Sequence, residues 1–222
     1  MGPLIVFGAG GHGKVVADAA ISAGFEVIAF GDDDARKRGT IVLGIPVSCI
    51  GPAEVAELGR ARSARVVVAI GDNRQRARCF DRILATALPI ATVIHRAATI
   101  AASARVGSGT VVLAGAVVNP GAVMGDDVIV NTSASVDHDN VIGDHVHVCP
   151  GVHLGGGVRV GHGTHLGIGT SVRDQVSIGE LVMIGAGAVV VGALPDRVLA
   201  VGCPARVVRA IEGWGIKDRS SG

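Results

Sequence analysis

The chain has 222 residues, enough for one or two domains with a sizeable core. Although 49% of its residues are hydrophobic, no stretch approaches the ~18 uninterrupted apolar residues of a membrane span, and the start lacks the basic segment of a signal peptide. A net charge of +1, dispersed Lys and Arg and the absence of Tyr argue against a nucleic-acid partner. The four cysteines form no CxxC pair, so we expect no disulfide framework and a cytoplasmic location.

The first element is a short apolar strand, Leu4–Phe7, which ends in the loop GAGGHGK. A helical pattern follows, and a second strand over Glu26–Phe30 ends in an acidic run. Strand, glycine loop, helix and strand together are typical of a nucleotide-binding unit. The glycines satisfy GxGxxG, and an acidic residue follows about 20 residues on; these positions are Gly8, Gly10, Gly13 and Asp32. Such a loop turns free N–H groups toward a phosphate, although glycines alone can also permit a tight turn.

The next predicted elements are a short helix over Glu54–Gly59 and a buried strand over Arg65–Ile70, which ends in GDNRQR. Gly71 would then lie at the carboxyl end of a parallel strand, where ligands of open α/β sheets gather. A helix over 76–87 and a strand over 90–94 complete a unit of about 95 residues, half of a full dinucleotide domain. We therefore predict a Rossmann-like nucleotide-binding domain over residues 1–96.

From residue 100 to 190 an aliphatic residue recurs at every sixth position without a break. This period matches neither an α-helix nor a flat strand, and glycine often follows the aliphatic position. Both features indicate hexapeptide repeats, in which three hexads form one triangular coil of a parallel β-helix. We expect this domain over residues 97–195 and a C-terminal cap and frayed tail over 196–222, with 207–211 as a short strand or helix. The sixteen positions run from Ile100 through Val106, Val112, Val118, Met124, Val130, Val136, Ile142, Val148, Leu154, Val160, Leu166, Val172, Ile178 and Ile184 to Val190.

Six of the eight histidines fall between residues 138 and 165. His138 lies between Asp137 and Asp139, and a carboxylate can fix an imidazole in one tautomer and stabilise its protonated form. We therefore expect His138 to be a general base. His145 and His147 are spaced HxH, but without a set of carboxylates we expect no metal site. Cys149 has no base dedicated to it and is expected to be a small buried residue.

Taken together, the segments GAGGHGKVVAD, FGDDD, AIGDNRQR, VNTSASVDHDNVIGDHVHVCPG and VGCPARVV resemble a family of sugar acyltransferases. Its members join a Rossmann-like domain to a left-handed β-helix and include bacillosamine and perosamine N-acetyltransferases and sialic acid O-acetyltransferases. The resemblance covers nearly the whole chain and implies the left-handed winding, acetyl-CoA as co-substrate and a homotrimer with active sites between subunits. The predicted fold is thus an α/β Rossmann-like domain plus a left-handed parallel β-helix.

The resemblance also implies roles for particular residues. It makes His138 the catalytic base, with Asp139 orienting it, and places acetyl-CoA against His147, Ile168 and Ala186. It assigns the nucleotide-sugar to six positions: Gly10, Gly11, His12, Asp32, Asp33 and Gly71. The family often has an aliphatic residue before its acidic pair, where this chain has Gly31.

The resemblance thus implies an acetyl-CoA-dependent N-acetyltransferase that acts on the amine of a UDP- or GDP-linked 4-amino-deoxy sugar. The nearest alternative is O-acetylation of sialic acid or another sugar. The glycine loop with Asp32 also leaves an NAD-dependent oxidoreductase as a distant alternative, although the β-helix would then have no function in the reaction. A binding scaffold without catalytic activity is a third possibility, which the acidic neighbours of His138 disfavour.

Overall fold

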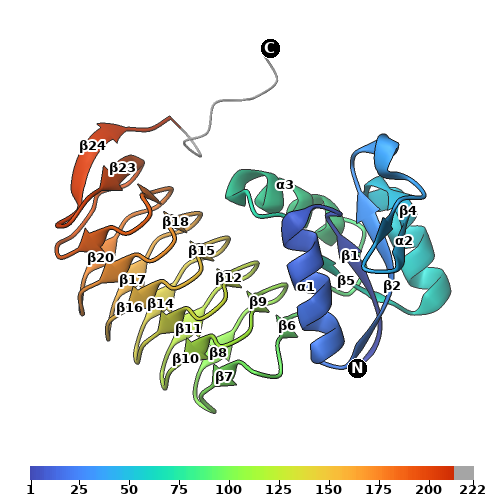
Figure 1. Ribbon diagram of the computed structural model, residues 1–222, viewed down its shortest axis with the longest axis horizontal. Coiled ribbons are helices and arrows are strands. Elements are labelled where there is room, and N and C mark those ends of the chain that lie inside the picture. Colours follow the sequence, from blue (N-terminus) through green and yellow to red (C-terminus); the bar gives the residue numbers. More distant parts are fainter. Residues whose placement is uncertain (213–222) are drawn as a thin grey trace.

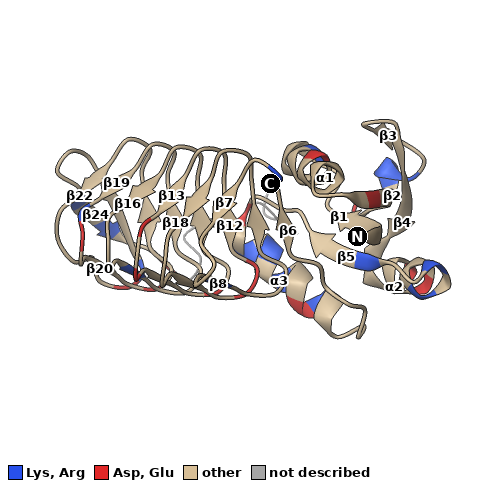
Figure 2. Ribbon diagram, turned by 90° about the horizontal axis from the view of Figure 1, so that it is seen from below, with Lys and Arg blue, Asp and Glu red and all other residues tan. Residues whose placement is uncertain are grey.

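A computed structural model describes residues 1–212. The N-terminal part contains a five-stranded sheet with strand order β3-β4-β2-β1-β5. Helix α1 lies on one side of this sheet and α2 on the other (Figures 1 and 2). The elements of this part are β1 (Gly2–Phe7), α1 (Gly11–Ser22), β2 (Phe25–Asp32), a 3-10 turn (Ala35–Lys37), β3 (Ile41–Val42), β4 (Ile45–Ile50), α2 (Gly51–Arg62), β5 (Arg65–Val68) and α3 (Asn73–Leu84).

Strand β1 is buried on both faces, as a central parallel strand must be. Leu4 and Val6 pack into the cluster that contains α1, while Ile5 and Phe7 pack into the cluster that contains residues of α2 and α3. The predicted strand, loop, helix and strand are confirmed. The hairpin of β3 and β4 was not predicted; β4 extends the sheet parallel to β2, and β3 pairs antiparallel to β4.

The repeats form a three-sided parallel β-helix, which extends from the N-terminal part in Figure 1. Each hexad contributes one two-residue strand, whose second residue is the aliphatic position. From β6 to β19, each strand pairs with the strand 18 residues on, for example Val117 with Ser135. The strands are β6 (Val93–Ile94), β7 (Thr99–Ile100), β8 (Arg105–Val106), β9 (Val111–Val112), β10 (Val117–Val118), β11 (Val123–Met124), β12 (Ile129–Val130), β13 (Ser135–Val136), β14 (Val141–Ile142), β15 (His147–Val148), β16 (His153–Leu154), β17 (Arg159–Val160), β18 (His165–Leu166), β19 (Ser171–Val172), β20 (Ser177–Ile178), β21 (Met183–Ile184) and β22 (Val189–Val190).

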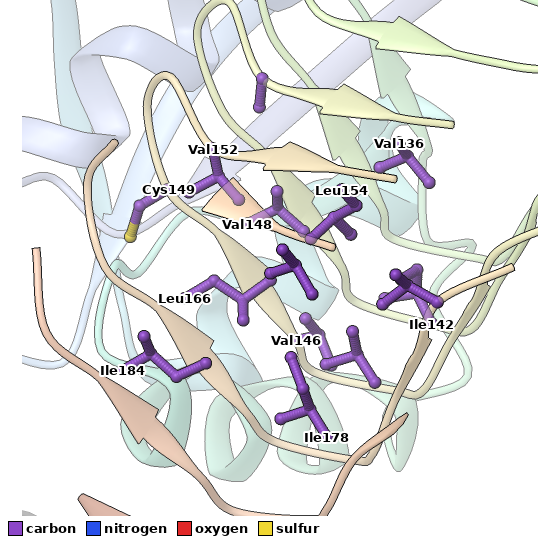
Figure 3. Close-up of a cluster of buried hydrophobic side chains, with 14 of the residues drawn as sticks. Val136, Ile142, Val146, Val148, Cys149, Val152, Leu154, Leu166, Ile178 and Ile184 are labelled. Atoms are coloured by element: carbon purple, nitrogen blue, oxygen red, sulfur yellow. The ribbon is translucent and has the colours of Figure 1, made fainter. Parts of the chain in front are cut away.

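The aliphatic positions stack inside the prism, as Val148, Leu166 and Ile184 do on one face (Figure 3). The third residue after nearly every aliphatic position adopts a positive φ, and this residue is often glycine. Asp127, Asp139 and His145 occupy the same position with φ of 54°, 58° and 57°. Asp and His adopt this conformation more readily than most residues. The turn at each corner therefore restricts the backbone of the third residue after the aliphatic position. The sequence pattern had drawn attention only to the residue directly after that position.

The C-terminal end of the prism is covered by a hairpin of β23 (Val198–Val201) and β24 (Arg206–Ala210). The predicted cap segment is thus a strand, while the predicted frayed tail at 213–222 lies outside the described residues. The division at residues 96 and 195 stays a prediction. Within residues 1–212 no helix has the length and apolar character needed to cross a membrane.

Candidate functional site

The corner between β13 and β14 carries a histidine–carboxylate pair. His138 Nδ1 lies 2.8 Å from Asp139 Oδ2, and the two side chains are 62% and 73% exposed. Asp139 can accept a hydrogen bond from Nδ1–H, which leaves Nε2 as the ring nitrogen that carries the lone pair. Hydrogen bonding to Asp139, reinforced by the charges of Asp137 and Asp139, raises the pKa of His138 above its ordinary value. The pair therefore has the geometry of a general base with an orienting carboxylate.

The corner that holds this pair is fixed by neighbouring polar groups. Asp137 Oδ1 accepts hydrogen bonds from His138 N at 2.8 Å and from Asn119 Nδ2, one coil earlier, at 2.9 Å. The buried Asn140 amide donates to the carbonyls of Asp137 and Gly155. The backbone around His138 is consequently tied to the coils on both sides.

Glycine on the next coil makes room for the imidazole. A Cβ on Gly156, which is 18 residues after His138, would lie 2.5 Å from His138 Nε2 and 2.6 Å from Cε1. On the preceding coil, a Cβ on Gly121 would meet Asp139 Oδ1. Both members of the pair therefore lie over glycines that leave space for their side chains.

A cavity of about 450 Å³ opens at the carboxyl ends of β1 and β5. Its size and its place at the edge of an α/β sheet are typical of a small-molecule site. It brings together all six residues that the sequence assigned to the nucleotide-sugar, which are Gly10, Gly11, His12, Asp32, Asp33 and Gly71. Gly10 precedes α1 as its N-cap, so the first N–H groups of that helix lie at the cavity.

The two aspartates in the cavity already have partners. Asp32 accepts hydrogen bonds from Ala9 N at 2.8 Å and Lys37 Nζ at 2.7 Å, so it fixes the glycine loop. Burial alone would raise the pKa of Asp32, but these hydrogen bonds and one from Asp34 N lower it below the ordinary value. Asp33 forms a bidentate pair with Arg82, at 2.7 and 2.9 Å.

Sequence reasoning missed the wall that α3 contributes to this cavity. Gln75, Arg78, Cys79 and Arg82 all line it. Their spacing of three and four residues places them on one face of a helix, and this polar periodicity could have revealed them. Two guanidinium groups here suit a ligand that carries phosphates.

His12 and His147 meet where the N-terminal part contacts the β-helix, with ring centroids 6.1 Å apart. His12 lines the cavity, and its buried Nε2 has no hydrogen-bond partner within residues 1–212. Burial, reinforced by the charge of Arg76, lowers the pKa of His12 to about 4. Its ring is therefore neutral at pH 7.

His147 is only 6% exposed and has partners inside the chain. Its Nδ1 lies 3.2 Å from Gly71 O, and its Nε2 lies 3.1 Å from Asn131 Nδ2. Burial lowers the pKa of His147 well below the ordinary value and raises that of the Cys149 thiol to about 12. The thiol of Cys149 is thus protonated at pH 7, which excludes it as a nucleophile in this state.

A second feature missed from the sequence is the buried Arg76, whose side chain is fully enclosed. Arg76 Nε bonds Asp127 Oδ2 at 3.0 Å, and its terminal nitrogens donate to the carbonyls of Ile70 and His145. The same Asp127 oxygen lies 2.7 Å from His145 Nδ1. The buried guanidinium therefore fastens α3 to the β-helix and holds the cavity in place relative to it. The side chains of His145 and His147 contact different partners, so their ring nitrogens do not meet at one position.

The histidine–carboxylate pair and the cavity lie on different corners of the β-helix. The residues of α3 contact Asp127, His145 and Gly163, all on the corner that precedes the sheet of β12, β15 and β18. His138 lies instead on the corner that precedes β14. Within residues 1–212 no β-helix residue lines the cavity.

The remaining predicted residues, Ile168 and Ala186, lie on the third corner. They are 18 residues apart on successive coils, and Gly187 N donates to Ile168 O at 2.7 Å. Both are exposed, and Ile168 is 60% accessible although it is a large apolar residue. They therefore form an apolar ridge open to solvent.

Several known proteins are similar to this chain. A family model of the PglD N-terminal domain matches residues 3–83. The acetyltransferase domain of PglB from Neisseria gonorrhoeae is 40% identical, with a TM-score of 0.86 over 93% of this chain and 99% of that one. PerB from Caulobacter crescentus, in complex with CoA and GDP-perosamine, is 39% identical, with a TM-score of 0.86 over 92% and 96% of the two chains.

WeeI from Acinetobacter baumannii shares the fold at 23% identity, with a TM-score of 0.72 over 94% of this chain and all of that one. A comparison with curated protein sequences returned no match. A nucleotide-type α/β domain joined to a β-helix that carries a histidine–carboxylate pair defines an acyltransferase of the hexapeptide-repeat class. More particularly, the chain belongs to the family of sugar acyltransferases that join a PglD-type N-terminal domain to a left-handed β-helix.

Proposed function

We propose that the chain is an acetyl-CoA-dependent N-acetyltransferase that acts on the amine of a UDP- or GDP-linked 4-amino-deoxy sugar. The observation that carries this proposal is the exposed His138–Asp139 pair, in a chain that also has a cavity lined by the glycine loop and the acidic residues at the end of β2. Similarity over nearly the whole chain to the acetyltransferase domain of PglB and to PerB supports it, because these structures have been solved with acetyl coenzyme A and with CoA and GDP-perosamine.

The proposed transfer is direct and occurs in a ternary complex. The sugar amine attacks the thioester carbonyl of acetyl-CoA, while His138 Nε2 takes a proton from the amine. An N–C bond forms, the C–S bond breaks, and the proton passes to the departing thiolate of CoA. Asp139 holds Nδ1–H and stabilises the imidazolium formed in the transition state. Backbone N–H groups of the coil would stabilise the oxyanion, and no step requires a metal.

The cavity holds the nucleotide-sugar in this proposal. The N-terminus of α1 and the side chain of Arg78 favour an anionic diphosphate, while Arg82 is paired with Asp33. His12 would contact the same ligand, because it lines the cavity. Acetyl-CoA would lie along the ridge of Ile168 and Ala186. For His147, contact with acetyl-CoA stays a prediction from the family resemblance.

We further propose a homotrimer with active sites between subunits. The cavity and His138 belong to different corners of one prism, so a single chain does not present both to one ligand. Threefold association of parallel prisms would bring the His138 corner of one subunit toward a neighbour. We place the enzyme in the cytoplasm, in line with its free cysteines, and in the synthesis of a polysaccharide precursor.

The test is a chromatographic assay of CoA release and acetylated product with UDP- and GDP-linked amino sugars, with free sialic acid as competitor substrate. We expect turnover only with a nucleotide-linked amine, and replacement of His138 by Ala should lower turnover by about 10²–10⁴-fold. His153→Ala is the matched control, because His153 is an exposed histidine whose Nδ1 lies 2.8 Å from the hydroxyl of Ser135 on the neighbouring strand of the same sheet. Turnover with sialic acid alone would indicate O-acetylation, and an undiminished His138→Ala enzyme would refute the assignment.

A further inference from the structure

Three side chains that can ligate a metal meet at the junction of the two parts of the chain. His147, Cys149 and His165 each offer one ligand atom, and these atoms lie within 4.8 Å of one another. No second group of this kind occurs within residues 1–212. His147 and Cys149 flank the inward-facing Val148, and His165 pairs with His147 one coil later. The repeat itself therefore places the three groups together.

The distances suit a tetrahedral ion. Cys149 Sγ lies 3.4 Å from His165 Nε2, at the edge of the aliphatic interior (Figure 3). Zinc bonds of about 2.0–2.3 Å place ligand atoms roughly 3.3–3.8 Å apart, so this pair already fits. The rings of His147 and His165 are nearly perpendicular, at 84°, with centroids 5.2 Å apart. With all three ligand atoms within 4.8 Å of one another, a shift of no more than about 1.5 Å would bring the third ligand into place.

The surroundings provide an outer shell and access. His147 Nδ1 faces the carbonyl of Gly71 at 3.2 Å, the arrangement that commonly orients a zinc-bound histidine through its other ring nitrogen. Nε2 is then the ligating nitrogen, and the ion would displace the Asn131 amide that now lies 3.1 Å away. His165 and Gly71 also line a cavity of about 190 Å³, which leaves room for water at a fourth position.

We propose that His147, Cys149 and His165 form a three-ligand Zn²⁺ site between the β-helix and the N-terminal part. One thiolate and two imidazoles favour zinc over magnesium or calcium, which take oxygen ligands. The site differs from the His145 and His147 pair considered from the sequence, and it does not depend on the proposed acetyl transfer. Through Gly71, which lines the nucleotide cavity as well, a bound ion would fasten the cavity wall to the β-helix.

The test uses the full-length protein after treatment with a chelator. Co²⁺ is added as a spectroscopic probe, and Zn²⁺ affinity is measured in competition with a chromophoric chelator. We expect one ion per chain, with a thiolate-to-cobalt charge-transfer band. Cys149→Ser should abolish that band, and His165→Gln should weaken binding by more than the ~10–100-fold typical of losing an outer-shell group.

The matched controls are Cys203→Ser, which removes the exposed thiol, and His153→Gln, which removes an exposed imidazole on another sheet. Both should bind as wild type does. Circular dichroism checks that each variant folds. If one of the two ligand variants does not fold, the other alone tests the proposal. The proposal is overturned if the wild type shows no saturable binding at one ion per chain. Binding that survives both ligand variants, or is lost in the controls, would indicate an adventitious ion only.

Discussion

The space above Gly156 is the feature of the corner around His138 that can be tested most directly. Gly156 does not have a positive φ, so its backbone accepts alanine. The added Cβ would lie 2.5 Å from His138 Nε2, whereas ordinary contact begins near 3.4 Å. The imidazole of Gly156→Ala must therefore move by about 1 Å, and such a misplacement of a catalytic group can cost ~10²-fold in rate.

A loss of 10² corresponds to about 2.7 kcal/mol of transition-state stabilisation. We expect this loss in kcat, with little change in melting temperature, because the side chain of His138 is 62% exposed and can move into solvent. Steady-state kinetics of Gly156→Ala would be compared with Gly192→Ala, where a Cβ meets no atom within 4 Å. Unchanged kcat in Gly156→Ala would refute the idea that glycine positions the base.

Two further outcomes follow from the charged groups. In Asp139→Asn the pKa of His138 should fall, because hydrogen bonding to this carboxylate is the main cause of its rise. His138 must be neutral to accept a proton, so the acidic limb of the pH profile of kcat/KM should move to lower pH. The plateau should drop by up to ~10²-fold. An acidic limb that does not move would contradict the pairing of His138 with Asp139. Asp127→Asn leaves the buried Arg76 guanidinium without its carboxylate, which should cost about 3–5 kcal/mol of unfolding free energy in urea denaturation. Arg82→Ala, which breaks an exposed pair, should change the free energy of unfolding by no more than ~1 kcal/mol. Equal losses in the two variants would show that burial of the Arg76–Asp127 pair does not add to its contribution to stability.

The periodicity of the sequence was sufficient to predict the β-helix. Inward positions recur every six residues because each side of the prism repeats one local geometry, so aliphatic residues such as Val148 and Leu166 reveal it without knowledge of distant contacts. The same holds for the glycine loop before α1, where strand, turn and helix are adjacent in the chain. His138 and Asp139 were also predictable as a pair, since they are neighbours in sequence.

Contacts between distant segments were decided by tertiary structure alone. Arg76 and Asp127 are 51 residues apart, and nothing in either neighbourhood predicts that they meet in a buried pair. His147 was expected to contact acetyl-CoA, but its burial against Gly71 depends on how the N-terminal part packs on one corner of the prism. A repeat pattern specifies which side chains face outward. Which outward-facing residues become buried is determined by the surface that packs against them, because burial and pairing depend on both partners.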